Sequence, residues 1–219
     1  IYTAGDANAD YDIFGDHISR FVHTIGYTSP HITENRPSEQ EIFDILMGKR
    51  TEEGAGQKLP EGTSAREAYA EHVQETMKEK FKQDFSHLTV TETIDSIEYF
   101  AFPNAFFFPG LQLSMVYRFR PNGVDGALFD LLFLRPKPID GPCPPPPEPF
   151  SLEIEDSYTK CPGTEFLGAV YDQDTNNLLS QTKGFKSSFK KGQSLGNYQE
   201  ARTRHFHQTI DKYLENING

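Results

Sequence analysis

The chain has 219 residues and a formal net charge of −11, from 32 acidic and 21 basic side chains. Its length suits one sizeable domain that buries most of its apolar surface without disulfides. The acidic charge excludes sequence-independent nucleic-acid binding, because neutralising phosphates requires a basic surface. The longest apolar stretches, near Phe106 and Leu131, are too short to span a membrane. The chain opens on Ile1 without a signal peptide, and we therefore expect it to be part of a longer, cytoplasmic polypeptide.

The first third of the chain predicts helices after a loop region. Residues 1–36 are polar and rich in Gly and Asp, which favours ordered loop with short turns. Ser38 followed by Glu41 forms a capping box and predicts a helix that runs to Met47. Residues 50–62 are charged and rich in Gly, as in a surface loop. Thr63 or Ser64 then caps a second predicted helix, which continues through Lys82 with apolar residues near helical spacing.

The middle of the chain predicts an antiparallel sheet. From Thr89 the sequence alternates and β-branched and aromatic residues dominate, so residues 89–94 lead into predicted strands at 97–102, 111–120 and 127–135. Pro121-Asn122-Gly123 is a strong turn signal between the last two strands. Polar residues recur at every second position of 111–120, which indicates one buried and one wet face.

The last third combines a proline-rich segment with two predicted helices. Residues 141–147 read as a stiff polyproline spacer, or as a peptide ligand for a partner module. One helix is predicted from Asp174 to about Gly184 and another over Tyr198–Asn216. Cys143 and Cys161 each precede a proline. A disulfide between them and two free thiols are both open, and free thiols fit a cytoplasmic protein better.

The segment Tyr171–Leu178 carries the strongest chemical signal. Two carboxylates, Asp172 and Asp174, and three amides follow the apolar run Phe166–Val170, where a strand or loop passes into a helix. Taken locally, either carboxylate can cap that helix and complement its dipole.

In a wider context this segment resembles a known family. Together with Thr3–Asn8, Phe102–Phe108 and Gly196–His207, it is similar to the catalytic domain of the large (alpha) subunit of Rieske non-haem iron ring-hydroxylating oxygenases. The resemblance implies an α+β fold of the helix-grip (START/Bet v 1-like) type, an antiparallel sheet around a long helix. It also implies that residues 1–219 form one catalytic domain that is incomplete at its N-terminus. Placing Asn177-Leu178 on the family's Asn-apolar pair makes Asp174 the carboxylate ligand of a 2-His-1-carboxylate iron site.

The histidines leave two interpretations open. His17 and His23 have five residues between them and, with Asp174, would complete a facial triad for iron. In the family, however, the string around Asp16-His17 lies just downstream of the iron-binding pair, which implies that both iron-binding histidines precede Ile1. His17 and His23 would then be structural. His205 lies on the apolar stripe of the last predicted helix, and we expect it to be a satisfied core residue.

The resemblance also implies cofactors and partners. They are mononuclear Fe(II), a 2Fe-2S Rieske cluster in a domain outside this chain, and NAD(P)H acting through a reductase or ferredoxin. The substrate would be an aromatic molecule oxidised with O2, and the assembly a homotrimer or an α3β3 complex. The 18 Phe and 10 Tyr suit an apolar pocket. The alternative function is a non-catalytic helix-grip domain that binds an apolar ligand without metal or reductant.

Overall fold

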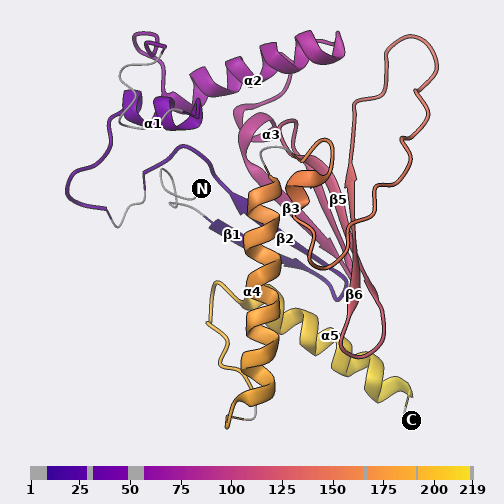
Figure 1. Cartoon of the computed structure of the whole chain (residues 1–219). Helices are drawn as coiled ribbons and strands as arrows, with labels where there is room; N and C mark the ends of the chain where they lie inside the picture. The colour runs from indigo at the N-terminus through magenta and orange to yellow at the C-terminus, as the bar shows by residue number, and fades with distance from the viewer. Residues whose placement is uncertain (1–8, 29–31, 49–56, 165–166, 191, 218–219) are drawn as a thin grey trace. The chain divides into compact units, whose positions relative to one another are not determined.

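The computed structural model describes residues 9–28, 32–48, 57–164, 167–190 and 192–217. The chain divides into two compact units (Figure 1). The first comprises residues 1–141 and 195–219, and the second residues 142–194. Each unit is described by itself. None of the described helices is both long enough and apolar enough to cross a membrane.

The first unit is built on a six-stranded antiparallel sheet in which neighbours in sequence are neighbours in space. The strands are β1 (Ala9–Phe14), β2 (Ile18–His23), β3 (Ser96–Ala101), β4 (Ala105–Pro109), β5 (Ser114–Pro121) and β6 (Ala127–Phe133). The predicted strands in the middle of the chain are confirmed as β3, β5 and β6. The predicted turn at Pro121–Gly123 joins β5 to β6, with Gly123 at φ +76°.

Two predictions about local structure were wrong. Residues 9–23, expected to be loop, form β1 and β2, because their aromatic residues share one face and their charges pair on the other: Tyr11 opposes Phe21, and Asp12 opposes Arg20. Residues 90–94, expected to lead into a strand, form the short helix α3 (Val90–Ile94). Thr89 and Glu92 make a capping box there, and this local pair of hydrogen bonds favours the helix over the alternating pattern.

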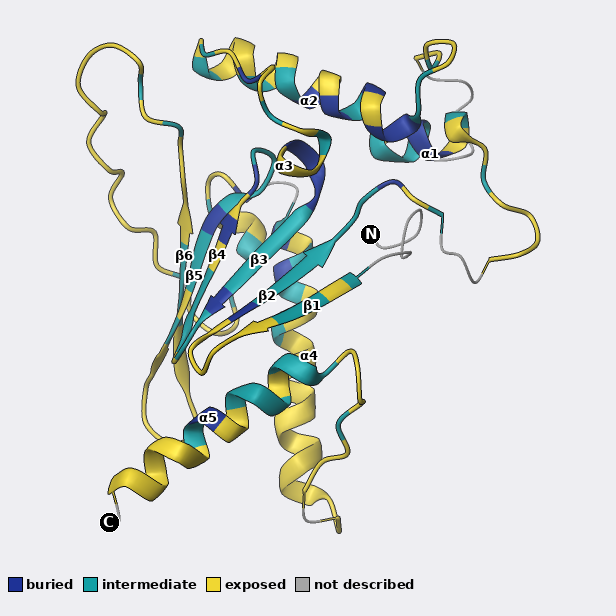
Figure 2. Ribbon diagram, turned by 180° about the vertical axis from the view of Figure 1, so that it is seen from behind, coloured by how far each residue is buried: buried dark blue, intermediate teal, exposed yellow. Residues whose placement is uncertain are grey.

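Helices α1 (Glu39–Leu46) and α2 (Ala65–Phe81) confirm the two predicted helices between β2 and β3. Ser38 and Ser64 are their N-caps, each in a complete capping box. The two helices pack on one another through Ile42, Phe43 and Ala65, which are all buried. Figure 2 shows this buried seam between the ends of α1 and α2.

Helix α5 (Ala201–Ile217) lies on one face of the sheet, across β1 to β3. The Arg202 guanidinium donates to Glu98 at 2.5 Å and to Ser19 at 3.1 Å. The Phe206 ring meets Phe100 edge-on, with centroids 5.6 Å apart. An antiparallel sheet carrying a long helix is the α+β, helix-grip arrangement that the resemblance implies. We call this the α5 face of the sheet.

The second unit consists of an extended proline-rich segment, the 3-10 turn η1 (Tyr158–Lys160) and helix α4 (Gly168–Ser187). Residues 142–151 are exposed and belong to no helix or strand. Cys143 and Cys161 are free thiols. Helix α4 begins at Gly168, six residues before the predicted start at Asp174, so Gly168–Val170 of the apolar run form its first turn. Phe166 lies outside the described residues.

Candidate functional site

The two carboxylates of the acidic segment have different surroundings. Asp172 accepts hydrogen bonds through both oxygens: Oδ2 from the Ser157 hydroxyl at 2.6 Å, and Oδ1 from the Tyr158 backbone N–H at 2.9 Å. The Tyr171 ring packs on Tyr158, with centroids 5.4 Å apart. Asp172 therefore links α4 to η1 and has a structural role. It is not an N-cap, because the helix begins four residues earlier.

Asp174 is exposed on α4 and has no hydrogen bond or ion pair to any described residue. Leu178 and Phe185 follow it at helical spacings of four and eleven residues, which places all three on one face of the helix. Leu178 is 55% exposed and Phe185 is 52% exposed. A free carboxylate and uncovered apolar side chains thus share one stripe of α4.

The structure separates His17 from His23. His17 precedes β2 and His23 ends it, so six residues of extended chain span about 20 Å between their Cα atoms. The His17 Nε2 lies 2.9 Å from the Tyr213 hydroxyl, and the His23 ring stacks on Phe21. Two imidazoles about 2 Å from one metal ion cannot be that far apart. Among the described residues no group of three His, Cys, Asp or Glu could hold a metal ion. The triad containing both His17 and His23 was therefore a wrong alternative.

His205, Thr209 and Lys212 of α5 all bind the β1–β2 turn, and we call these three contacts the α5 clasp. The His205 Nε2–H donates to the Gly15 carbonyl at 2.8 Å, and the Thr209 hydroxyl donates to the Asp16 carbonyl at 2.9 Å. Lys212 pairs with the Asp16 carboxylate at 2.5 Å. The prediction that the His205 ring is fully hydrogen-bonded holds only for Nε2, because no described residue bonds to its buried Nδ1.

An aromatic surface continues from α5 across the α5 face of the sheet. Phe100 opposes Phe106, Phe106 opposes Tyr117, and Tyr117 opposes Leu131 in the strand register, so these side chains lie on one face. The Phe106 ring is 4.9 Å from Phe100. The sequence identified the aromatic cluster of residues 102–108, but only the register shows that Phe106 lies on this face. We call these side chains, with Phe119 and Phe129, the aromatic surface.

The charged residues of β5 and β6 lie on the opposite face of the sheet. Arg120 binds both oxygens of Asp130, at 2.7 and 2.8 Å, and Arg118 donates to Oδ2 at 2.8 Å. The hydrogen bonds from Arg120 are the main cause that lowers the pKa of Asp130 to about 2. Strand alternation thus leaves the aromatic surface free of charged side chains along β5 and β6, which suits an apolar aromatic ligand.

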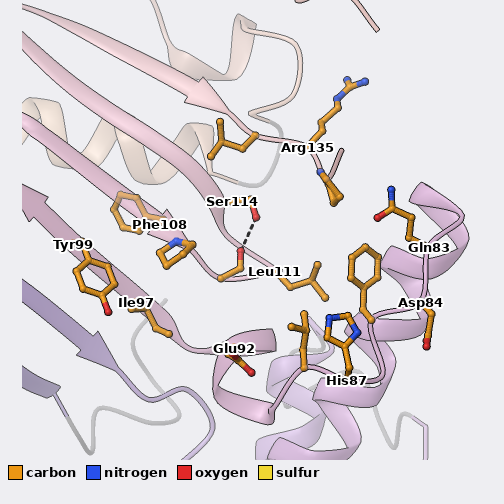
Figure 3. A pocket seen from close by; sticks show the side chains of 16 residues that line it. Gln83, Asp84, His87, Glu92, Ile97, Tyr99, Phe108, Leu111, Ser114 and Arg135 are labelled. Atoms are coloured by element: carbon orange, nitrogen blue, oxygen red, sulfur yellow. Dashed lines mark hydrogen bonds between the residues drawn. The ribbon is translucent and has the colours of Figure 1, made fainter. Parts of the chain in front are cut away.

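A separate hollow of about 670 Å³ lies where the sheet meets the end of α2 and helix α3 (Figure 3). Phe85 and Leu88 form one wall, and Ile97 and Leu111 contribute the other. Ile97 alternates with Glu98, which contacts α5, so this part of the wall belongs to the face opposite α5. Sequence reasoning missed this hollow, because its walls come from segments that are far apart in the chain.

The first unit is an antiparallel sheet with helices and an apolar aromatic surface, and helix α4 of the second unit carries the exposed carboxylate of Asp174. Comparison with protein families gives the class: the model of the ring hydroxylating alpha subunit (catalytic domain) matches residues 20–216. The chain belongs to this family, whose members are catalytic domains of oxidoreductases. Searches of curated proteins and of solved structures found no match.

Proposed function

We propose that the chain is the catalytic domain of a Rieske-type dioxygenase that hydroxylates an aromatic substrate at a 2-His-1-carboxylate iron, with Asp174 as the carboxylate ligand. One observation supports Asp174 over its neighbour. Both oxygens of Asp172 accept hydrogen bonds from η1, whereas Asp174 is exposed and unengaged. Each oxygen of Asp172 already accepts one hydrogen bond, whereas both oxygens of Asp174 are open to a metal ion, which favours Asp174 as the ligand.

The chain supplies part of the ligand set that ferrous iron requires. A carboxylate oxygen is a suitable ligand, and the remaining two positions require imidazoles. In our proposal both imidazoles come from residues that precede Ile1, because His17 and His23 lie too far apart to serve. Iron supplies dioxygen activation when it is bound. The chain's own contribution is Asp174 as one ligand and the aromatic surface, which holds a ring by shape and excludes water.

The electron supply belongs to the same proposal. A 2Fe-2S Rieske cluster in a domain outside this chain would receive electrons from NAD(P)H through a reductase or ferredoxin. The assembly would be a cytoplasmic homotrimer or α3β3 complex. These proposals rest on membership of the family and on no contact within the described residues.

The test compares three variants of the full-length subunit. Asp174→Ala should remove mononuclear iron, measured by elemental analysis, and turnover of an aromatic substrate should fall at least about a hundredfold, as for loss of a ligand or its supporting partner. Asp172→Asn retains one acceptor for η1 and should keep its iron. Asp211→Ala, an exposed aspartate of α5, controls for loss of charge. Full iron content and turnover in Asp174→Ala would refute the assignment.

The alternative function has its own support in the aromatic surface, which could hold a ligand without chemistry. Under that alternative the full-length subunit would bind an aromatic molecule with equal affinity whether iron is present or has been removed by a chelator. It would also yield no oxidised product when supplied with reductant. Product formation that depends on iron excludes it.

A further inference from the structure

The hollow at the end of α2 is lined mainly by apolar side chains, with His87 among them and three ionised side chains at its margin. Phe85 is 7% exposed, and Leu88, Ile97 and Leu111 are half-buried. Figure 3 shows Ile97 and Leu111 between the strands on one side and the end of α2 with α3 on the other. Its volume of about 670 Å³ falls within the range of roughly 300–1,000 Å³ that is typical of small-molecule sites.

Polar groups around the hollow are largely engaged within the protein. The Gln83 amide donates to the Lys137 carbonyl at 2.6 Å, which links the end of α2 to the segment after β6. The Ser114 hydroxyl donates to the Gly110 carbonyl at 2.7 Å. These groups are therefore poor candidates for fixing a polar ligand, because a ligand would have to displace bonds already made.

The charges at the margin disfavour an ionic ligand. Asp84 and Glu92 are negative and Arg135 is positive, so the ionised lining carries a net charge of −1 in a chain of charge −11. Hydrogen bonds from Ser86 lower the pKa of Asp84, and those from Thr89 lower the pKa of Glu92. Both carboxylates are thus charged, which repels anions, and both already accept protein donors. Arg135 extends away from the other lining side chains (Figure 3).

We propose that this hollow is a second binding site, for a small uncharged aromatic or alicyclic molecule. It is distinct from the aromatic surface, because Ile97 and Tyr99 line it from the face opposite α5. The lining residues all belong to the first unit, and Asp174 belongs to the second. Binding there depends on apolar contact and not on an ion pair.

The chain has no Trp, which allows a single-tryptophan test. Leu134→Trp places the only Trp of the chain at the margin of the hollow. Leu128→Trp is the matched control: the two leucines are 49% and 46% exposed, and Leu128 does not line the hollow. Ethylbenzene, benzoate and benzyltrimethylammonium present one ring with no charge, a negative charge and a positive charge. All three leave a window in which Trp emission can be excited alone.

We expect ethylbenzene to shift the Trp emission of Leu134→Trp to shorter wavelength with saturation, and to leave Leu128→Trp unchanged. Benzoate and benzyltrimethylammonium should bind at least about tenfold more weakly. Leu111→Ala added to Leu134→Trp should weaken ethylbenzene binding by about tenfold, through lost apolar contact. Arg135→Ala should have no effect, and Asp174→Ala should have none either, which separates this site from the proposed function.

Three results would overturn the proposal. The first is tighter binding of benzoate that is lost in Arg135→Ala, which would make the hollow an anion site. The second is an equal response of both Trp variants, which would mean non-specific partitioning. The third is no response up to the solubility of ethylbenzene. Should Leu134→Trp not fold, ring-current shifts of the Leu111 methyl NMR signals in the unmodified chain provide the same readout.

Discussion

The buried ion pair between Arg66 and Asp95 should be the most sensitive charged contact in the first unit. The two side chains are 8% and 0% exposed, and they meet in a two-pronged contact at 2.7 and 2.9 Å. Asp95 also accepts the Ile25 backbone N–H at 2.9 Å. Arg66 lies over the Tyr27 ring, 4.6 Å from its centroid. The pair thus joins α2, the start of β3 and the segment after β2.

Asp95→Ala leaves the Arg66 guanidinium buried without its counter-ion. Removing one partner of a buried pair costs about 3–5 kcal/mol in the free energy of unfolding. For a chain of this size, each kcal/mol lowers the melting temperature by about 2–4 °C. The expected loss is therefore about 6–20 °C, which thermal unfolding followed by far-UV circular dichroism at neutral pH would detect.

The matched control is Asp12→Ala, which removes an ion pair with Arg20 whose side chains are 38% and 35% exposed. A pair so open to water contributes about 0–1 kcal/mol, so melting should change by less than about 4 °C. The double variant Arg66→Met/Asp95→Leu should recover most of the stability, because it removes both buried charges. If Asp95→Ala melts no lower than Asp12→Ala, the reasoning from burial is refuted.

Further predictions concern acid stability, backbone strain and the α5 clasp. The pKa of Asp130 is lowered to about 2, so its stabilising contribution is present above about pH 4 and is lost as the pH falls towards 2. Asp130→Asn should therefore reduce the loss of stability between pH 4 and pH 2 in acid unfolding. An NMR titration midpoint near 4 for the Asp130 carboxyl would contradict this prediction. Gly26→Ala should lower the free energy of unfolding more than Gly123→Ala in denaturant unfolding. Both glycines have φ near +78°, but only a Cβ added at Gly26 would lie 3.0 and 3.1 Å from neighbouring side chains. Equal losses would show that strain in φ alone matters. Thr209→Val should cost about 1–3 kcal/mol in the same assay by leaving the Asp16 carbonyl without its donor, and no loss would mean that water replaces the hydroxyl.

Local hydrogen bonding made the first helices predictable. Ser38 and Glu41 are three residues apart, so the capping box that begins α1 is contained in the sequence itself. The same signal at Thr89 and Glu92 was present but was outweighed by the alternation of β-branched residues, and the structure shows that the cap prevails. Alternation was informative where a strand has one wet face, as in β5.

Strands β1 and β2 could not be predicted, because their stabilisation is not local. Their sequence is polar, and its polar residues find partners on a neighbouring strand or on α5: Arg20 on Asp12, and Ser19 on Arg202, which is 183 residues away. Predicting a loop from local polarity takes no account of partners so distant in the sequence. The hollow at the end of α2 could not be predicted for the same reason, since its walls come from separate segments of the chain.

The sequence by itself determined the capped helices, the strands of the middle region, the resemblance to ring-hydroxylating alpha subunits and the choice of the acidic segment on α4. Those features depend on residues that are neighbours in the chain. Only the tertiary structure decided that Asp172 is engaged by η1 while Asp174 is free, because the partners Ser157 and Tyr158 are 14 or 15 residues away. Likewise, alternation shows which side chains share a face of the sheet, but only packing shows which face α5 covers.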